Sequence, residues 1–353
     1  MMESLYAQAE YGKVVLKKKT IAKPGPGQLL LEAVYSSISP GTEHTLLSGM
    51  ILPLPQNIGY SMIAKVIETG EGVSEYKAGD MVAATAQHAS YILVDERIVT
   101  PIPDGTDLEQ AAFFTLIQTA MYGIRRTKIQ PGESVAVLGQ GIVGLLTAQL
   151  AGIAGACPVI VTARNDKRLE YSKAIGAHHA VNVRANPDEL SDVVKSLGTG
   201  GVSVVFEAAG SREPLDTAFR IVRERGRVML LGVVSAVDGG GGTSHEALAN
   251  IFEKGVSLIG GYVNTKPYAL KSHIISGFVQ WPPILKSGAD RFVSSEIWTS
   301  DEDNRAILNL IKYGVLDMRP LITHRFSPDM IPEAYDMVWQ QDRDMIGGLI
   351  CWK

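Results

Sequence analysis

One short stretch of the chain has glycines at the spacing needed to hold a phosphate group against backbone. It is the run Gly139-Gln140-Gly141-Ile142-Val143-Gly144. The run follows an apolar segment, 135–138, and opens another, so we expect a strand, a tight turn and a helix. There Gly139 makes the turn, Gly141 lets backbone approach a pyrophosphate, and Gly144 lets the helix pack closely. The run therefore predicts a dinucleotide site, the alternative being a glycine-rich turn that only packs.

The residues after the next predicted strand bear on which dinucleotide would bind. An NAD site usually has Asp or Glu about 20 residues beyond the glycines, where it accepts hydrogen bonds from the ribose hydroxyls. This chain instead has Ala163-Arg164, followed by Arg168. A carboxylate would repel a 2′-phosphate, whereas Arg binds one in a bidentate manner. These residues favour NADP, although Asp166 lies close enough to turn inward and the cations could simply face solvent.

The elements that must position this site alternate in type. Six predicted strands are each joined by a predicted helix, which is the pattern of a doubly wound parallel sheet. The strands are 135–138, 159–162, 180–182, 202–206, 227–231 and 256–259. Before Gly123 the chain has short β segments between Gly/Pro turns, and after Val263 it is irregular until a helix at 303–313 and a strand at 347–351. We therefore expect a β-rich domain over 1–122 and 263–353, with a dinucleotide-binding domain inserted at 123–262.

Composition and charge exclude several classes of protein. A net charge of −4 supplies no basic field for nucleic acid or an anionic membrane. No window of 18 apolar residues without charge predicts a membrane span, and the N-terminus lacks the pattern of a signal peptide. The two cysteines, Cys157 and Cys351, cannot build a disulfide framework or a four-cysteine zinc lobe. We expect a reduced, cytoplasmic protein.

Many short motifs, in one order, resemble the medium-chain dehydrogenase/reductase superfamily over nearly the whole chain. They are Pro24-Gly25-Pro26-Gly27, Gly41-Thr42-Glu43, 59–70, Gly79-Asp80-Met81-Val82, Pro103-Asp104-Gly105, the glycine run, Glu207-Ala208-Ala209-Gly210, Gly226-Arg227-Val228 and Leu321-Ile322-Thr323-His324. The resemblance implies an α/β fold in which a GroES-like β-rich catalytic domain carries an inserted Rossmann domain. Ser39-Pro40-Gly41-Thr42-Glu43 is also similar to a subgroup with bacteriochlorophyllide dehydrogenase-like proteins.

The chain departs from this superfamily at the zinc ligands. Its zinc alcohol dehydrogenases carry Cys-Gly-Thr/Ser-Asp and Gly-His-Glu, where this chain has Pro40 in place of the cysteine and Tyr60 in place of the histidine. The third ligand, often Cys, falls near Thr115. Catalytic zinc needs three ligands drawn from Cys, His and carboxylate. We expect no metal site.

Without zinc, hydride transfer needs another group to stabilise the substrate oxygen. The resemblance places Tyr60 and Thr42 there, the first as a phenol donor or a packing residue, the second as the hydroxyl that relays protons. It also implies that the backbone of Gly232-Val233-Val234 bonds the nicotinamide carboxamide. His88 precedes a predicted strand, and we expect a surface or capping residue more than an acid.

Together these features predict a zinc-independent, NADP(H)-dependent oxidoreductase. It would move a hydride between nicotinamide and a carbonyl or secondary alcohol of a small molecule held between the two domains. An NADPH-dependent enoyl reductase is the alternative, since it needs only enolate stabilisation, and an NADP-binding sensor or structural protein is the non-enzyme alternative. The resemblance also implies a homodimer or homotetramer, joined at the edge of the sheet near 228–231 and 256–259.

Overall fold

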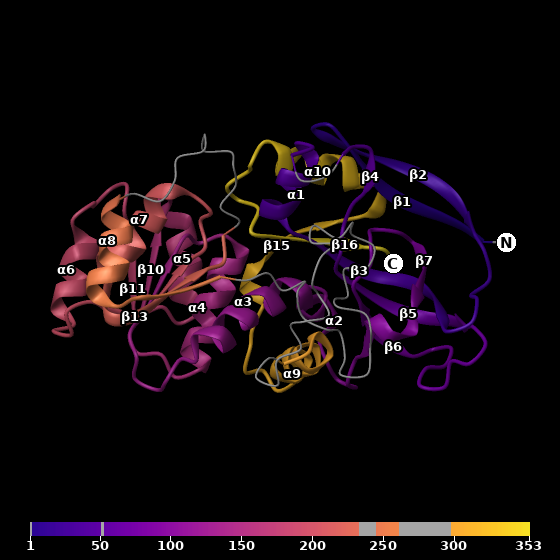
Figure 1. Ribbon diagram of the computed structural model, residues 1–353. Helices are drawn as coiled ribbons and strands as arrows, with labels where there is room; N and C mark the ends of the chain where they lie inside the picture. The colour runs from indigo at the N-terminus through magenta and orange to yellow at the C-terminus, as the bar shows by residue number, and fades with distance from the viewer. Residues whose placement is uncertain (1, 51–52, 233–244, 261–297) are drawn as a thin grey trace. The chain divides into compact units, whose positions relative to one another are not determined.

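The computed structural model describes residues 2–50, 53–232, 245–260 and 298–353, with backbone alone for 245–248 (Figure 1). The chain divides into two compact units. The first comprises Met1–Gln118 with Val263–Lys353, and the second comprises Thr119–Tyr262. The division thus falls at 118/119, where the sequence placed it at 122/123. No helix in the described part of the chain is both long and apolar enough to cross a lipid bilayer.

The first unit is built on two sheets. A seven-stranded sheet has the order β15-β16-β3-β5-β6-β8, with β7 paired to β3, and a three-stranded sheet has the order β2-β1-β4. The strands are β1 Met2–Glu10, β2 Lys13–Ile21, β3 Gln28–Ile38, β4 Gln56–Asn57, β5 Met62–Thr69, β6 Met81–Ala84, β7 Tyr91–Asp95, β8 Val99–Pro101, β15 Ile322–Phe326 and β16 Gly347–Cys351. The helices of this unit are α1 Pro40–Leu47, α2 Leu108–Ala111, α9 Ser300–Lys312 and α10 Ile331–Trp339; α3, Phe114–Thr127, continues into the second unit.

Two apolar cores hold these elements. One lies among β3, β5, β6, β7 and β8, whose inward residues include Leu31 and Val66. The other lies among β1, α1, α10 and β16, and α10 packs against both α1 and β2. Tyr335 of α10 is fully buried in this second core. A tyrosine buried to that extent needs a hydrogen-bond partner for its hydroxyl. The core around α1 must therefore contain polar groups as well as apolar ones.

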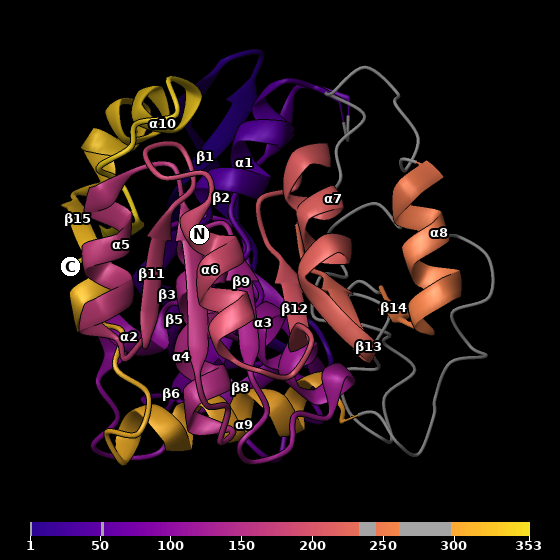
Figure 2. The same cartoon turned by 90° about the vertical axis from the view of Figure 1, so that its left-hand side faces the viewer.

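The second unit is a six-stranded parallel sheet. Its order, β11-β10-β9-β12-β13-β14, is that of a doubly wound dinucleotide fold, and Figure 2 shows β11, β9, β12, β13 and β14 following one another across it. The strands are β9 Val135–Leu138, β10 Val159–Ala163, β11 His179–Asn182, β12 Val202–Glu207, β13 Val222–Leu230 and β14 Ser257–Ile259. The helices are α4 Ile142–Ile153, α5 Asp166–Ala174, α6 Glu189–Ser196, α7 Arg212–Ile221 and α8 His245–Lys254. The chain order reverses between β9 and β12, and a doubly wound sheet binds its ligand at the carboxyl ends of the strands beside such a reversal.

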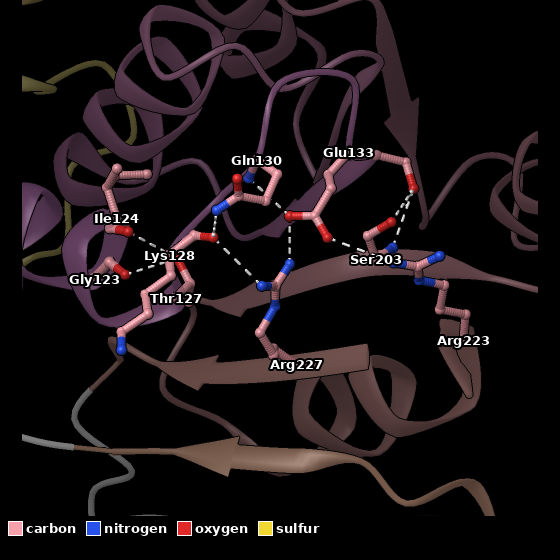
Figure 3. Close-up of polar contacts among 10 residues, drawn as sticks. Gly123, Ile124, Thr127, Lys128, Gln130, Glu133, Ser203, Arg223 and Arg227 are labelled. Carbon is pink, nitrogen blue, oxygen red and sulfur yellow. Dashed lines mark hydrogen bonds and ion pairs between the residues drawn. The ribbon is translucent and has the colours of Figure 1, made fainter. Parts of the chain in front are cut away.

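An ionic cluster ties β13 to the loop before β9 (Figure 3). The carboxylate of Glu133 accepts hydrogen bonds from Arg227 and, at 2.9 Å, from the backbone N–H of Gln130; Arg223 lies at 3.4 Å. Arg227 also donates to the carbonyl oxygen of Lys128 at 3.4 Å. Burial acts to raise the pKa of Glu133, but these donors outweigh it and lower the pKa. The cluster therefore stabilises the amino-terminal side of the sheet through an ionised carboxylate.

Several elements differ from what the sequence predicts. Strand β1 and helices α1 and α10 were not expected. The helical spacing of 108–126 favours one helix, whereas the structure has two, α2 and α3. Helix α1 begins at Pro40, with Gly41 next, a pair that reads as a turn in the sequence. In the structure Pro40 occupies the first helical position, where the missing N–H costs nothing. Thr42 thus lies in the first turn of a helix.

Candidate functional site

The glycine run forms the predicted turn between β9 and α4. Gly139 has φ +98°, in the left-handed region, and a Cβ there would lie 2.9 Å from the backbone nitrogen of Ala209. A Cβ on Gly144 would overlap the carbonyl oxygen of Gly139, whereas nothing lies within 4 Å of one on Gly141. Gly139 and Gly144 are therefore required by close packing, while Gly141 keeps open space in front of the backbone.

Helix α4 presents its N-terminus at this open space. Gly141 is the N-cap, and no side chain caps the helix. Ile142 is buried and Val143 is half-buried, so their side chains anchor the first turn while Gly141 is exposed. The first amide groups of a helix have no partner within the helix, and the dipole there favours an anion. This is the arrangement that holds a pyrophosphate in dinucleotide folds.

Two polar side chains fix the shape of the turn from behind. The buried Gln140 amide donates to the carbonyl oxygens of Val137 and Gly139 at 3.0 and 3.1 Å, and its Oε1 accepts from Ser172. Arg168 donates to the backbone oxygen of Gln140 at 3.0 Å. The side chains of Gln140 and Arg168 thus hold the turn itself in shape. Only the backbone of Gln140 is then left to contact a ligand.

At the end of β10, the positively charged Arg164 and the negatively charged Asp166 have different surroundings. Ala163 is buried as the last residue of the strand, and Arg164 immediately after it is exposed. Asp166, in the first turn of α5, accepts a hydrogen bond from Asn182 Nδ2 at 2.7 Å. Asn165 caps the same helix through the N–H of Lys167. The carboxylate is therefore held toward β11, and the guanidinium of Arg164 is exposed at the strand end.

The carboxyl ends of β12 and β13 lie on the other side of the point where the chain order reverses. Glu207 is buried, which raises the pKa of its carboxyl, and its Oε1 accepts from the N–H groups of Ala209 and Gly210 at 2.8 Å. The N–H of Gly232 donates to the carbonyl oxygen of Glu207, and a Cβ on Gly232 would lie 2.7 Å from Glu207 Oε2. Gly232 is thus required where the sequence predicts a cofactor contact. Its predicted companions, Val233 and Val234, lie outside the described residues.

Tyr60 and Thr42, the two predicted catalytic residues, both belong to the first unit. Tyr60 is 8% exposed and follows Gly59, whose φ is +94°. Thr42 is half-buried in the first turn of α1. A phenol this deeply buried is shielded from bulk water, a suitable setting for a group that donates to a developing oxyanion.

The side chains at the superfamily's zinc-ligand positions do not suit the metal. Pro40 has no donor atom, Tyr60 stands in the histidine position, and Thr115 is a buried residue of α3. In the described ranges, no three His, Cys, Asp or Glu side chains gather in a way that could hold a metal ion. The donor set that zinc needs is not brought together by these residues.

A buried polar group beside Tyr60 was missed by the sequence analysis. Glu43 and His88 are both 0% exposed, and Tyr335 donates to Glu43 Oε2 at 2.7 Å. His88 Nδ1 lies 2.8 Å from Ser36 Oγ. The expectation of a surface or capping histidine was wrong, because β3, α1 and α10 enclose this imidazole. No local pattern signals it, since the polar side chains that face this imidazole lie 45 or more positions away in the chain.

Burial also decides the charge of these two groups. It raises the pKa of Glu43 to about 8, although the hydrogen bond from Tyr335 acts in the opposite direction. It lowers the pKa of His88 to about 3. Near neutral pH both groups are therefore held mainly in their uncharged forms.

Comparisons with known proteins show that the chain is similar to dehydrogenases. Residues 25–104 match the alcohol dehydrogenase GroES-like domain and residues 143–276 match the zinc-binding dehydrogenase family, together more than half of the chain. Sorbitol dehydrogenase of Bacillus subtilis is 27% identical over 220 residues, 54% of this chain and 62% of that protein. The match thus spans less than two thirds of that relative. (R,R)-butanediol dehydrogenase of Bacillus subtilis is 26% identical over 356 residues, 89% of each chain.

The fold also has solved counterparts. The structure of 2R,3R-butanediol dehydrogenase from Bacillus subtilis covers 99% of this chain and 100% of its own, at a TM-score of 0.79 and 19% identity. A Sinorhizobium meliloti 1021 protein bound to NADP covers 99% and 100%, at a TM-score of 0.77 and 23% identity. The GroES-like first unit, the doubly wound second unit and both family matches agree. The chain belongs to the medium-chain dehydrogenase/reductase superfamily.

Proposed function

We propose that the protein is an NADP(H)-dependent oxidoreductase that interconverts a carbonyl and a secondary alcohol of a small organic molecule, without a catalytic zinc ion. The observation that carries this proposal is the glycine-lined turn, which opens on the uncapped N-terminus of α4 beside the exposed Arg164. Several relatives are dehydrogenases of alcohols or polyols by name, including the sorbitol and butanediol enzymes. A bound nicotinamide supplies or accepts the hydride.

The preference for NADP rests on the charges at the end of β10. The 2′-phosphate of NADP carries more than one negative charge near pH 7, and a guanidinium pairs with it in a bidentate manner. Arg164 is exposed there, and the competing carboxylate of Asp166 is engaged by Asn182. A relative of the same fold was solved with NADP.

Tyr60 is the group we assign to the substrate oxygen. In carbonyl reduction, hydride adds to the carbonyl carbon, the π electrons move to oxygen, and the phenol O–H gives that oxygen its proton. The reverse sequence oxidises the alcohol. Thr42, in the first turn of α1, is the hydroxyl we assign to proton relay. Pro40 and Tyr60 at the ligand positions favour this route over a metal Lewis acid.

Two other functions remain as outcomes of experiment. An enoyl reductase would oxidise NADPH with an enone and leave the matched saturated ketone untouched. A sensor or structural protein would bind NADPH and oxidise it with neither. Supplying both substrates to the same preparation separates the three cases.

A fluorescence titration with NADPH and NADH tests the cofactor assignment. We expect NADPH to bind at least tenfold more tightly, and Arg164→Ala to remove most of that difference while leaving NADH affinity unchanged. Lys173→Ala is the matched control, since Lys173 lies in the last turn of the same helix that Asp166 begins. Equal affinities in the unaltered protein would refute the role of Arg164.

We also propose that the protein is a homodimer or homotetramer joined along β14. This strand pairs with β13 on one side, and Phe252 and Leu258 near this edge are 89% and 48% exposed. Exposed apolar side chains beside an edge strand favour association. Light scattering should give a multiple of the 38.0 kDa chain mass, and Leu258→Lys should lower it.

A further inference from the structure

Two buried polar atoms face each other in the first unit, each without a partner in the described structure. They are Oε1 of Glu43 and Nε2 of His88, which lie 4.0 Å apart. Both side chains are 0% exposed, so bulk water does not reach them. The other polar atoms of the two side chains are bonded, to Tyr335 and to Ser36.

Leaving both atoms unsatisfied would be costly. A buried polar atom without a hydrogen bond destabilises the fold, and here two such atoms would lie side by side. A movement of about 1 Å would bring the pair to hydrogen-bond distance. An uncharged carboxylic acid facing an uncharged imidazole fits a water-free core, since it buries no ion.

His88 also packs against the backbone that carries Tyr60. A Cβ on Gly59 would lie 2.5 Å from the ring of His88, so the imidazole packs directly against the residue before Tyr60. On the other side, the carbonyl oxygen of Ser61 accepts the N–H of Ser37 at 3.1 Å. Burial raises the pKa of Tyr335, the residue that bonds Glu43, and the nearby Tyr60 phenol raises it further.

We propose that protonated Glu43 donates a hydrogen bond to Nε2 of His88 and that this pair positions the phenol of Tyr60. His88 then carries its own proton on Nδ1 and donates to Ser36 Oγ, which also accepts from Trp352 Nε1 at 2.9 Å. Glu43 and His88 are positioning residues, because they act on the substrate only through Tyr60. The consequence for catalysis rests on the proposed role of Tyr60, whereas the hydrogen-bonded pair itself does not.

NMR of histidine labelled with 15N and 13C tests the pair without any substrate. We expect His88 to be neutral at pH 7, with its proton on Nδ1 and Nε2 acting as an acceptor. A proton on Nε2 or a charged ring would overturn the proposal. Glu43→Gln should preserve the acceptor state of Nε2, because its amide N–H replaces the carboxylic O–H and its carbonyl still accepts from Tyr335.

Variants of Glu43 then test the positioning of Tyr60. Glu43→Ala should shift the 13Cζ resonance of Tyr60 and lower kcat at least tenfold, with KM for NADPH unchanged within twofold. Glu43→Gln should leave the resonance in place and keep kcat within threefold of the unaltered protein. His44→Gln is the control, because His44 is next to Glu43 in sequence but stacks on Trp339 and bonds Gln341 instead.

The outcomes separate this inference from the proposed function. If no substrate oxidises NADPH, the proposed function fails while the resonances of His88 and Tyr60 still decide the pair. If Glu43→Gln loses activity as Glu43→Ala does, an ionised carboxylate is required and the proposal is wrong. If Glu43→Ala does not fold, the unaltered protein and Glu43→Gln remain sufficient to decide it.

Discussion

The glycine turn of the second unit and the core around Tyr60 in the first unit are built in opposite ways. The turn is made by backbone, and its residues are neighbours in sequence from Gly139 to Gly144. The core around Tyr60 is made by side chains from distant parts of the chain, with Glu43 bonded to Tyr335 across 292 positions. A backbone site leaves a local glycine pattern in the sequence, whereas a side-chain site leaves none.

This difference predicts which substitutions should destabilise each region. The turn should fail when a Cβ is added at a position where two backbone segments meet. The core should fail when the pairing of its buried polar groups is disturbed. Glycine substitutions can test both regions, because the chain offers matched positions with and without a close neighbour.

Gly144→Ala should have the largest effect. Its Cβ would overlap the carbonyl oxygen of Gly139, a backbone atom that cannot move without opening the turn. We expect a loss of about 3 kcal/mol or more in the free energy of unfolding, together with loss of NADPH binding. Gly152→Ala in the same helix has nothing within 4 Å and should be neutral or stabilise by about 0.5–1 kcal/mol. Chemical denaturation checks both, and equal effects would contradict the backbone contact.

Gly59→Ala should come next. It combines a left-handed φ of +94° with a Cβ 2.5 Å from the His88 ring, and we expect a loss of about 3 kcal/mol. Gly79→Ala has a similar φ of +100° but nothing within 4 Å, so it measures the cost of the backbone conformation alone, about 1 kcal/mol. Only Gly59→Ala should also shift the histidine resonances of His88. If both variants lose the same stability, the imidazole does not pack on this backbone.

The same contrast explains how much the sequence could predict. Strands β9 and β16 have the predicted bounds, because each is a short apolar run beside turn residues. The glycine turn and the doubly wound parallel sheet followed from local patterns. Helix α1 was missed because Pro40-Gly41 resembles a turn, and α10 because Pro332 resembles a breaker, although it lies at the start of the helix.

The first unit was predicted less completely for a physical reason. The resemblance pointed to Tyr60 and Thr42 by position, but not to what holds them. Burial of His88 depends on β3, α1 and α10 meeting around it, and no property of the residues next to His88 requires this. Long-range polar pairs of this kind become visible only when the fold is known.

Arg227→Met should have an intermediate effect on the second unit. The substitution removes the guanidinium that donates to Glu133 and to the carbonyl oxygen of Lys128. We expect the free energy of unfolding at pH 7 to fall by about 2 kcal/mol, measured by chemical denaturation. Because the pKa of Glu133 is lowered in the fold, its contribution is present above about pH 4.5 and lost as pH falls through the folded value. The difference between the two proteins should therefore shrink below pH 4.5. Arg223→Met is the control with a smaller loss, since Arg223 is more exposed and 3.4 Å away.

The smallest expected effect is a change in how stability depends on pH. The folded pKa of Glu43, about 8, lies above its unfolded value of 4.5, so the folded state binds more protons between these values and stability falls as pH rises through them. Glu43→Gln cannot titrate and should lack this slope. Between pH 6.5 and 7.5 the unaltered protein should lose about 1 kcal/mol relative to the variant. His88, with its pKa near 3 in the fold and 6.5 unfolded, titrates in both proteins, so its contribution cancels from this difference. If the two stability curves run parallel across this pH interval, Glu43 is already ionised in the fold. The core around Tyr60 would then hold a charged carboxylate, as the Glu133 cluster does.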